Sequence, residues 1–346
     1  MTTNITESIN EKRLAKLHNN PNHPICQMKE LIQSHFNGFS FFDTLNEAVS
    51  TKANFDDLLI PKDHPARSMN DTYYVDENTV LRTHTSAHQN DLMNAGETKF
   101  LVAGDVYRKD TIDKSHYPVF HQIEGVKIVA DNEDPLEDLK NTLIGLVNFL
   151  FPGKEYRFLD DYFPFTNPSL QIEVKVTDDY WMEILGCGVI EPKILENCGI
   201  KGHGWAFGLG LDRLLLYKAN IPDIRYLWTS DPRFIKQFSK GLTEFKEYSK
   251  FPITSRDISF WITGTPLKNK EQWEEHNNFC EVCREVGKDL IESIAQVDRF
   301  EKEERVSFAY KIVYRSNDRT LLGEEINDMQ TILRSRVVEN FGVTLR

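Results

Sequence analysis

The spacing of hydrophobic residues changes along the chain, and each change predicts a different kind of element. Apolar residues recur every three or four positions over residues 23–36, which predicts an amphipathic helix. Short apolar segments separated by Gly and Pro then follow between residues 55 and 225. They predict strands at 99–107, 123–129 and 170–176, the last with strict alternation of apolar and polar positions. Strands with one buried face favour a mostly antiparallel sheet.

The C-terminal part of the chain has a pattern of its own. Helices are predicted at 272–286 and 324–341, and strands at 257–262, 290–300, 306–314 and 343–345. The order β-α-β-β-α-β is that of a ferredoxin-like domain. We therefore expect an α+β protein with two domains, since 346 residues suffice for both. The expected boundaries are 1–235 for the first domain with an N-terminal extension at 1–22, 236–250 for a linker and 251–346 for the second domain.

Composition limits the classes of protein that fit this pattern. Hydrophobic residues make up 40% of the chain, enough to form a core, so intrinsic disorder is not expected. The longest apolar run, residues 141–151, is too short to span a bilayer, so no membrane partner is expected. The net charge of −12 argues against coating nucleic acid by bulk charge, because such binding requires clustered cations.

A smaller group of cations lies around the middle strands of the second domain. It is a candidate patch for an RNA backbone, and an ordinary solvated strand face is the alternative. Its members are Arg299, Lys302, Arg305, Lys311, Arg315 and Arg319.

The cysteines and the N-terminus bear on the compartment. Five cysteines in a chain of this length indicate a reducing environment rather than a disulfide framework. Cys280 and Cys283 have the spacing of a redox or zinc pair, but the helical spacing around them favours packing in a core. Residues 1–17 show neither the apolar segment of a signal peptide nor the Arg-rich pattern of an organellar transit peptide.

Residues 208–213, Gly-Leu-Gly-Leu-Asp-Arg, are the first segment whose side chains suit a ligand. The two glycines allow a backbone to approach a ligand closely, and the helix predicted at 211–218 begins with the amide end that favours an anion. A dinucleotide-binding loop would require a third glycine where Arg213 stands. Arg213 instead offers a charged fork for phosphate, and a simple strand-to-helix turn is the alternative.

Residues 104–108 and 120–125 predict a hairpin with complementary side chains. Arg108 stands at the end of the first strand. Phe120, Gln122 and Glu124 are two positions apart, so they share one face of the second strand. An aromatic ring, an amide and a carboxylate beside a guanidinium suit ligand binding, whereas a charged sheet face is the alternative for any single member.

Three further segments carry polar or aromatic groups. Residues 82–88 contain two histidines and three hydroxyl groups without the spacing of a zinc site, which suits polar recognition of a small substrate. Residues 162–165 place Phe163 and Phe165 on one side of an extended segment, an arrangement more usual in a core. Glu183 interrupts the apolar strand predicted at 181–188, where a carboxylate requires a cation or a ligand as its partner.

The order of these segments resembles that of the class II aminoacyl-tRNA synthetases. The hairpin that carries Arg108 and the segment 208–213 stand where that class has motifs 2 and 3, and residues 55–67 stand where it has motif 1. The resemblance implies an antiparallel sheet flanked by helices, followed by a ferredoxin-like β-α-β-β-α-β anticodon-binding domain. It covers residues 23–346, nearly the whole chain.

Four segments narrow the resemblance to the phenylalanyl-tRNA synthetases of the single-chain organellar, or mitochondrial, type. They are residues 84–88, 120–125, 162–165 and 203–208. The resemblance implies a ligase that attaches phenylalanine to tRNA-Phe in two steps. Phenylalanyl-adenylate and pyrophosphate form first, and the amino acid then passes to the terminal ribose 2′-OH of tRNA. ATP, Mg²⁺ carried with ATP, phenylalanine and tRNA-Phe are the implied cofactors and partners. A monomer in the mitochondrial matrix or another organelle is implied, with the cytoplasm as the alternative.

The same resemblance assigns residues to the two sites. Arg108 and Arg213 are the implied catalytic residues, on the α- and γ-phosphates of ATP. ATP would contact Arg108, His116, Tyr117, Phe120, Gly208, Gly210 and Arg213. The amino acid would contact His84, Ser86, Ala87, His88, Gln89, Ser115, Gln122, Ile123, Glu124, Phe163, Phe165, Glu183, Ala206 and Phe207. No protein ligand of magnesium is assigned, because Asn167 stands where bacterial members of the family carry a Glu.

Two other functions fit parts of this pattern. One is a synthetase-like protein without catalysis that binds tRNA, and the other is a ligase that adenylates a different carboxylate. The complete set Arg108, Phe120, Glu124 and Arg213 argues against the first. The paired phenylalanines and the second domain argue against the second.

Overall fold

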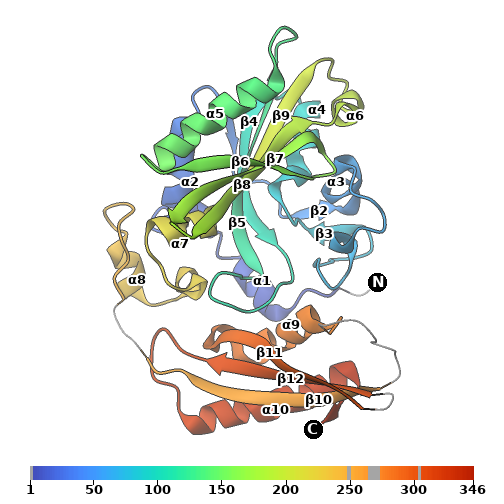
Figure 1. Ribbon diagram of the computed structural model, residues 1–346, viewed down its shortest axis with the longest axis vertical. Coiled ribbons are helices and arrows are strands. Elements are labelled where there is room, and N and C mark those ends of the chain that lie inside the picture. Colours follow the sequence, from blue (N-terminus) through green and yellow to red (C-terminus); the bar gives the residue numbers. More distant parts are fainter. Residues whose placement is uncertain (1–2, 248–250, 264–272, 303–304) are drawn as a thin grey trace.

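The computed structural model describes residues 3–247, 251–263, 273–302 and 305–346, which form two packed units (Figure 1). In the first unit, seven of the described strands form one sheet in the order β1-β4-β5-β9-β8-β7-β6. Its neighbours are antiparallel except for the edge pair β1 and β4, so the prediction of a mostly antiparallel sheet is confirmed. The strands are β1 (Ser40–Phe42), β4 (Lys99–Tyr107), β5 (Val119–Val129), β6 (Tyr156–Asp161), β7 (Thr166–Thr177), β8 (Tyr180–Ile190) and β9 (His203–Gly210).

Helices α2 (Pro24–His35), α5 (Pro135–Leu150) and α7 (Leu211–Lys218) cover one face of this sheet. Asp134 begins α5 as its N-cap, and every buried residue of that helix lies on one apolar stripe. Helices α4 (Gln89–Asn94) and α6 (Pro192–Asn197) pack at one end of the opposite face. The rest of that face stays open for side chains that bind a ligand.

The N-terminal part of the chain packs beside the sheet in short elements. They include the β2–β3 hairpin and several short helices. Their bounds are α1 (Glu7–Arg13), η1 (Leu17–Asn19), β2 (Ala48–Ser50), α3 (Thr51–Asn54), η2 (Asp56–Leu58), η3 (Pro65–Arg67), β3 (Thr79–Leu81) and η4 (Thr85–His88). After α7, the first unit continues with η5 (Ile224–Trp228) and α8 (Pro232–Gln237). Within the predicted linker, Phe238 and Phe245 are buried in the core of the first unit, while residues 248–250 lie outside the described residues.

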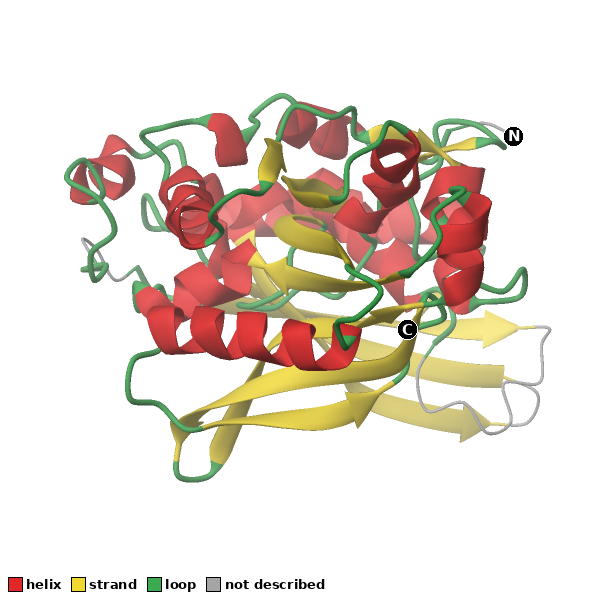
Figure 2. Cartoon of the chain, turned by 90° about the horizontal axis from the view of Figure 1, so that it is seen from above, coloured by secondary structure: helices red, strands yellow, loops and turns green. Residues whose placement is uncertain are grey.

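The second unit has the predicted β-α-β-β-α-β order. Its antiparallel sheet runs β11-β12-β10-β13, and both helices cover the same face (Figure 2). The predicted helix at 272–286 begins later, at His276, and Gln272 lies outside the described residues. The elements are β10 (Thr254–Thr263), α9 (His276–Gly287), η6 (Lys288–Leu290), β11 (Ile291–Lys302), β12 (Arg305–Tyr314), α10 (Gly323–Phe341) and β13 (Thr344–Leu345).

Cys280 and Cys283 both lie in the core between these helices and the sheet, so the packing interpretation is confirmed. Burial raises the pKa of the Cys280 thiol to about 12, which keeps it protonated. None of the described helices combines the length and the apolar character needed to cross a membrane.

The two units meet along the loop between β4 and β5. Ile112 of this loop is buried in the core of the second unit, where its carbonyl oxygen accepts a hydrogen bond of 2.9 Å from the Ile294 amide. Arg284 of α9 donates to the carbonyl oxygens of Asp110 and Thr111. The loop that follows Arg108 is therefore held by both units.

Candidate active site

Two adjoining cavities lie over the open face of the seven-stranded sheet. The larger has a volume of about 650 Å³ and the smaller about 300 Å³. The smaller cavity lies against the start of α7, where Arg213 lines it. The two cavities share Arg108, Asp110, Gln122, Glu183, Gly186 and Gly208. A ligand in one cavity would therefore meet a ligand in the other.

The strand register aligns Glu124 of β5, Gly208 of β9 and Gly186 of β8 in one row. A Cβ atom at Gly208 or at Gly210 would meet no atom within 4 Å, so both glycines face open space. The missing side chains leave the strand backbone accessible to a ligand beside Glu124. Phe120, Gln122 and Glu124 line the cavities from one face of β5, as their spacing predicted.

The Glu124 carboxylate is buried, with 3% of the residue exposed. Its Oε2 accepts hydrogen bonds from the hydroxyls of Ser86 and Thr85, the latter at 3.5 Å. Its Oε1 has no hydrogen-bond partner among the described residues. Burial raises the pKa of Glu124 to about 8, against the lowering effect of the two hydroxyls. A cation placed against Oε1 would restore the charged form.

Arg108 lies where the cavities join. Its Nε donates a 2.9 Å hydrogen bond to the Thr83 carbonyl oxygen, and its guanidinium carbon lies 5.5 Å from the centre of the Phe120 ring. The surrounding protein lowers the pKa of Arg108, but a guanidinium remains charged at neutral pH. Burial and the nearby Arg108 lower the pKa of His84 to about 3, so His84 is neutral in the larger cavity.

A buried pair connects β5 with α7. Asp212 accepts a 2.5 Å hydrogen bond from the His121 amide, and the His121 ring nitrogen Nδ1 lies 3.2 Å from both carboxylate oxygens. This contact fixes the start of α7, and with it Arg213, relative to Phe120. His121 and Asp212 are distant along the chain, and no motif or spacing predicted that they pair.

The loop after Arg108 is ordered by one carboxylate. Asp113 accepts hydrogen bonds from the amides of Ser115 and His116, from the Ser115 hydroxyl and from the His116 ring. Against the effect of burial, these hydrogen bonds lower the pKa of Asp113. Ser115, His116 and Tyr117 line the smaller cavity, and the Tyr117 hydroxyl donates to Asp289 of the second unit.

Aromatic rings form one wall of the larger cavity. The Phe163 and Phe165 rings are stacked with 5.7 Å between their centres and 17° between their planes. A Cβ atom at Gly186 would lie 2.7 Å from the Phe163 ring, so glycine at this position lets the ring approach β8 closely. Ala206 and Phe207 line the same cavity and make it apolar beside the phenylalanines.

Glu183 lines both cavities, and its side chain is exposed. The apolar strand around it predicted a carboxylate that requires a cation or a ligand as its partner, whereas solvent reaches this side chain. A β-bulge explains the difference, because Ile172 pairs with Leu185 whereas the next residue, Glu173, pairs with Glu183. The extra residue brings Glu183 to the same face as Gly186, where water solvates the carboxylate.

The structure brings most of the predicted site residues together. All seven residues assigned to ATP line the smaller cavity. Of those assigned to the amino acid, the larger cavity is lined by His84, Ser86, Gln122, Glu124, Phe163, Phe165, Glu183, Ala206 and Phe207.

The other residues assigned to the amino acid lie elsewhere. Ser115 lines the smaller cavity, while Ala87, His88, Gln89 and Ile123 line neither. Ile123 alternates with Gln122 and Glu124 along β5, so its side chain packs in the core on the opposite face. His88 instead contacts Arg82, with 3.0 Å between His88 Nε2 and Arg82 Nη1.

Sequence reasoning missed residues that come from distant segments. Asn277 of α9 donates a 3.2 Å hydrogen bond to Asp71, and both residues line the larger cavity. Lys109 and Asp110 line it as well. No spacing or motif relates Asn277 to the other residues, because only the docking of the second unit brings it there.

Within the described parts of the chain, no cluster of three His, Cys, Asp or Glu side chains could hold an ion. Asn167, which stands where bacterial relatives carry a Glu, is exposed and lines neither cavity.

Comparison with known proteins gives matches over both units. Residues 8–238 match the family described as tRNA synthetases class II core domain (F), and residues 249–346 match the ferredoxin-fold anticodon binding domain. The chloroplastic/mitochondrial phenylalanine–tRNA ligase of Arabidopsis thaliana is 46% identical over 100% of this chain and 83% of its own length. The mitochondrial enzymes of Mus musculus and Saccharomyces cerevisiae are 40% and 37% identical, over 99% and 100% of this chain and 85% and 92% of their own lengths.

The raised pKa of Glu124 predicts a pH-dependent effect on stability. From about pH 4.5, its ordinary pKa, to about pH 8, the folded chain keeps a proton on Glu124 that the unfolded chain has released. The free energy of unfolding therefore falls as the pH rises, by at most about 1.4 kcal/mol per pH unit. Glu124→Gln removes this dependence, so the variant should gain stability relative to the native chain toward pH 8. Urea unfolding across this range measures it. Glu196→Gln, at an exposed position, is the control, and parallel curves for all three proteins would contradict the prediction.

Proposed function

This chain belongs to the phenylalanine–tRNA ligases, a family of class II aminoacyl-tRNA synthetases, and we propose that its two cavities hold the substrates of the first reaction step. It is an enzyme that attaches phenylalanine to tRNA-Phe by way of phenylalanyl-adenylate. The observation that carries the assignment of the cavities is Arg108, which lines both of them. A carboxylate in the larger cavity would meet an α-phosphate in the smaller one at this guanidinium.

We propose that phenylalanine occupies the larger cavity. Its ammonium group would bind Glu124 Oε1 and Gln122, because Glu124 Oε2 is already engaged by Ser86 and Thr85. Its ring would lie against Phe163 and Phe165. An aromatic pair contributes about 0.5–1.5 kcal/mol beyond the burial of its area. The apolar wall offers no partner for a phenol, so it disfavours tyrosine only by leaving the hydroxyl unpaired, about a hundredfold effect.

We propose that ATP occupies the smaller cavity. Phe120 would stack on adenine and Arg213 would bind the γ-phosphate, with Gly208 and Gly210 leaving room for the nucleotide beside the strand backbone. The carboxylate of phenylalanine attacks the α-phosphorus and pyrophosphate leaves. Arg108 stabilises the charge that develops on the α-phosphate oxygens. Catalysis then consists of positioning and electrostatic stabilisation, without a protein nucleophile.

We propose that Mg²⁺ enters with ATP rather than occupying a site of its own. Mg²⁺ commonly binds through substrate phosphates and one or two carboxylates. Glu183 and Asp110 line both cavities, and the Glu183 side chain is exposed there. These two carboxylates would hold the ion, which supplies charge neutralisation for the phosphates.

The transfer to tRNA, the oligomeric state and the cellular compartment are inferred from the domain content and the relatives. We propose that the terminal ribose 2′-OH of tRNA attacks the adenylate. One chain carries both the synthetase core and the anticodon-binding domain, which supports a monomer. The relatives named above are mitochondrial or chloroplastic/mitochondrial enzymes, which supports work in an organelle.

The contact with the tRNA anticodon is proposed to lie on the helix-free face of the second unit. Trp261 and Phe300 lie there on β10 and β11, with 6.1 Å between their ring centres. Both residues flank Ser307 of β12 in the strand register. Arg305 lies 5.5 Å from the Trp261 ring, and Arg346 lies 5.5 Å and 5.6 Å from the two rings. Aromatic rings beside arginines are the usual platform for unstacked bases of RNA.

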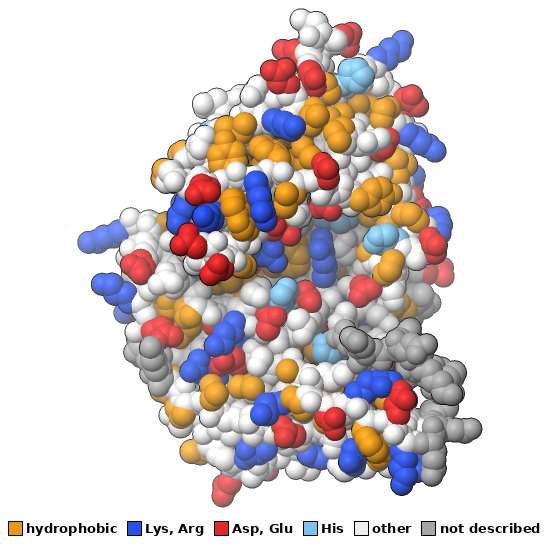
Figure 3. All heavy atoms as spheres, in the orientation of Figure 1, with side chains coloured by type: hydrophobic (Ala, Val, Ile, Leu, Met, Phe, Trp, Pro, Cys, Tyr) orange, Lys and Arg blue, Asp and Glu red, His pale blue; other side chains and the backbone are white. Residues whose placement is uncertain are grey.

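Three of the six cations in the predicted patch lie against carboxylates of the second unit. Arg299 pairs with Glu301, Arg319 pairs with Glu325, and Arg315 lies 3.4 Å from Glu292. Acidic and basic side chains are interspersed over the face drawn in Figure 3, so the described residues form no broad basic surface on that face. Binding to tRNA must then depend on a few local contacts.

ATP–pyrophosphate exchange tests the proposed function. Exchange should depend on phenylalanine, and charging should follow with tRNA-Phe. Exchange with another carboxylate and no charging would contradict the proposal, as would no exchange with any amino acid. Arg213→Ala should lower exchange by about 100-fold or more while the fold persists, because an electrostatic contact to the transferring phosphates is lost. Arg233→Ala, at an exposed position of helix α8, should leave exchange unchanged.

A second prediction concerns the size of the larger cavity. Ala206→Gly removes a methyl group from its lining, so para-substituted phenylalanines should gain in kcat/KM relative to phenylalanine. One methyl group in an apolar pocket changes such a ratio by about 10–200-fold. Exchange kinetics with para-chlorophenylalanine measure the ratio. Ala103→Gly is the matched control because Ala103 is buried in β4 and lines neither cavity. Equal ratios in the two variants would place the ring of the substrate elsewhere.

A third prediction concerns the RNA platform. Trp261→Ala removes one stacking surface, worth about 1–3 kcal/mol per base, so KM for tRNA-Phe in charging should rise by about tenfold or more. Exchange with phenylalanine and ATP should stay unchanged. Ile332→Ala, an exposed apolar position on α10 at the helix-covered side, is the control. An unchanged KM for tRNA in Trp261→Ala would show that the anticodon binds elsewhere.

A further inference from the structure

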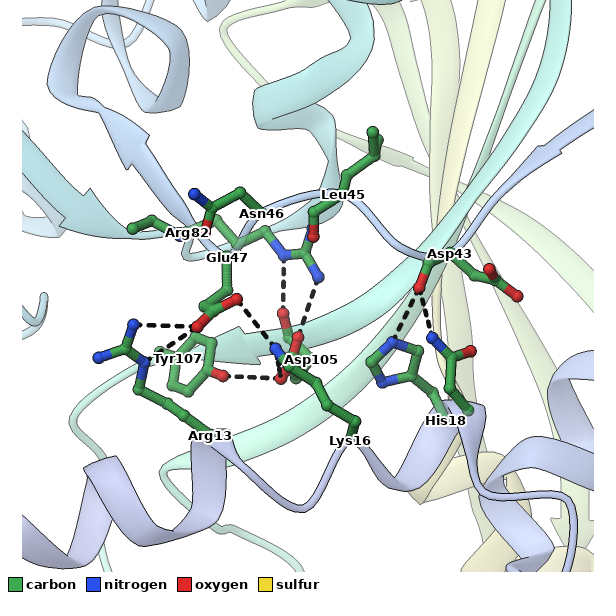
Figure 4. Close-up of polar contacts among 12 residues, drawn as sticks. Arg13, Lys16, His18, Asp43, Leu45, Asn46, Glu47, Arg82, Asp105 and Tyr107 are labelled. Atoms are coloured by element: carbon green, nitrogen blue, oxygen red, sulfur yellow. Dashed lines mark hydrogen bonds and ion pairs between the residues drawn. The ribbon is translucent and has the colours of Figure 1, made fainter.

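A network of charged side chains gathers around Asp105 and Arg82 (Figure 4), neither of which lines the two cavities. Its centre is Asp105 of β4, which is 2% exposed. Asp105 Oδ1 accepts a 3.0 Å hydrogen bond from Arg82, and Oδ2 accepts from the Tyr107 hydroxyl at 2.7 Å. The second cation at this site is Lys16, whose Nζ lies 3.0 Å from Oδ2. Against the effect of burial, Arg82 and Lys16 hold the pKa of Asp105 well below its usual range.

Lys16 reaches the network from the N-terminal segment, between α1 and η1. Its backbone has φ 41° and ψ 51°, a left-handed conformation that is strained for a residue with a side chain. The Lys16 ammonium also binds Glu47 Oε2 at 2.9 Å, and Arg13 binds the other oxygen of Glu47 at the same distance. A strained backbone that aims a cation at two buried or partly buried carboxylates indicates a specific role.

Arg82 connects this network with the cavity. Its Nε donates a 2.8 Å hydrogen bond to the Asp105 carbonyl oxygen, and its guanidinium lies against β4 at Gly104. A Cβ atom at Gly104 would lie 1.9 Å from Arg82 Nη2, so any other residue would displace the guanidinium. Arg82 is therefore held from several sides, and the residues that follow it are held with it.

The residues directly after Arg82 contact both proposed substrate sites. The Thr83 carbonyl oxygen accepts from Arg108 Nε, and the Thr85 and Ser86 hydroxyls donate to Glu124. Thr83 is held in turn by Asn54, through its amide and its hydroxyl, each at 3.0 Å. One short segment, residues 82–86, thus sets the positions of the guanidinium and the carboxylate that the proposed reaction uses.

We propose that Lys16 is a positioning residue for adenylate formation, acting through Asp105 and Arg82 on residues 82–86. This inference rests on the proposed function. The N-terminal segment then belongs to the support of the active site, although it carries none of the family motifs. Without the Lys16 ammonium, Asp105 keeps Arg82 and Tyr107 but loses the cation that fixes its second oxygen. Arg82 and the residues after it then have more than one arrangement, and a displacement of about 1 Å at Arg108 or Glu124 costs up to about 100-fold in rate.

Lys16→Met tests the proposal in the full chain by exchange kinetics, because methionine keeps an unbranched side chain without the charge. We expect kcat/KM for phenylalanine to fall about 10- to 100-fold. Lys16→Arg, which restores the charge, should recover most of the loss. Lys175→Met is the matched control, because Lys175 also contacts two carboxylates, Glu155 and Asp178, and lines neither cavity.

A double-mutant cycle separates positioning from a general loss of stability. If Lys16 acts through residues 82–86, Lys16→Met should cost less in a Ser86→Ala background than in the native chain. Additive effects would overturn the proposal, as would a lowered melting temperature with unchanged kinetics below it. Should Lys16→Met fail to fold, Tyr107→Phe removes one hydrogen bond from the same Asp105 oxygen and should show the same coupling to Ser86→Ala. A native chain without phenylalanine-dependent exchange would contradict the proposed function itself, which is a different result from an active native chain unaffected by Lys16→Met.

Discussion

The structure of the site depends on a carboxylate buried in a sheet. Glu124 lies in the middle of β5, and burial alone would make its ionised form costly. The described residues stabilise only one of its two oxygens. The Ser86 and Thr85 hydroxyls bind Oε2, and Oε1 has no hydrogen-bond partner among them. In the proposed binding mode, the ammonium group of phenylalanine would supply the missing partner. Discrimination for an amino acid would then begin with an unfavourable burial that the substrate relieves.

The same carboxylate constrains the residues around it. Space for a ligand beside Glu124 exists because Gly208 and Gly186 stand opposite it on β9 and β8. The hydroxyls that bind it come from residues 82–86, and these are anchored by Arg82 on Asp105. Strand register and a buried ion pair thus act together. A change in the strand register or in the Arg82–Asp105 ion pair would move the Glu124 carboxylate relative to Arg108. Arg108 lies at the junction of the cavities.

Much of this arrangement was predictable because it follows from the regular spacing of apolar residues along strands and helices. Strand 99–107 and helix 211–218 have the predicted bounds, and the shared face of Phe120, Gln122 and Glu124 follows from alternation along a strand. The resemblance to a family added which substrate each residue would meet. A prediction from residue spacing is wrong where the backbone of a strand or helix is irregular. The β-bulge at Ile184 turned Glu183 toward the cavities, and no pattern of apolar residues marks a bulge. Asn277 and Ile112 were unpredictable for another reason, since each contacts a unit that is distant in sequence.

The net charge of −12 is compatible with tRNA binding, because the proposed contact with RNA does not depend on a broad basic surface. Several cations of the second unit are engaged within the protein, as Arg284 binds Glu281 and the carbonyl oxygens of the loop that carries Ile112. Cations used to dock one unit on the other do not add to a surface for phosphate. The surface that we propose for RNA is instead an aromatic pair with Arg305 and Arg346 beside it. Stacking is far less sensitive to net charge than counterion release is. An acidic protein can therefore hold its tRNA by placed aromatic contacts and release it after transfer.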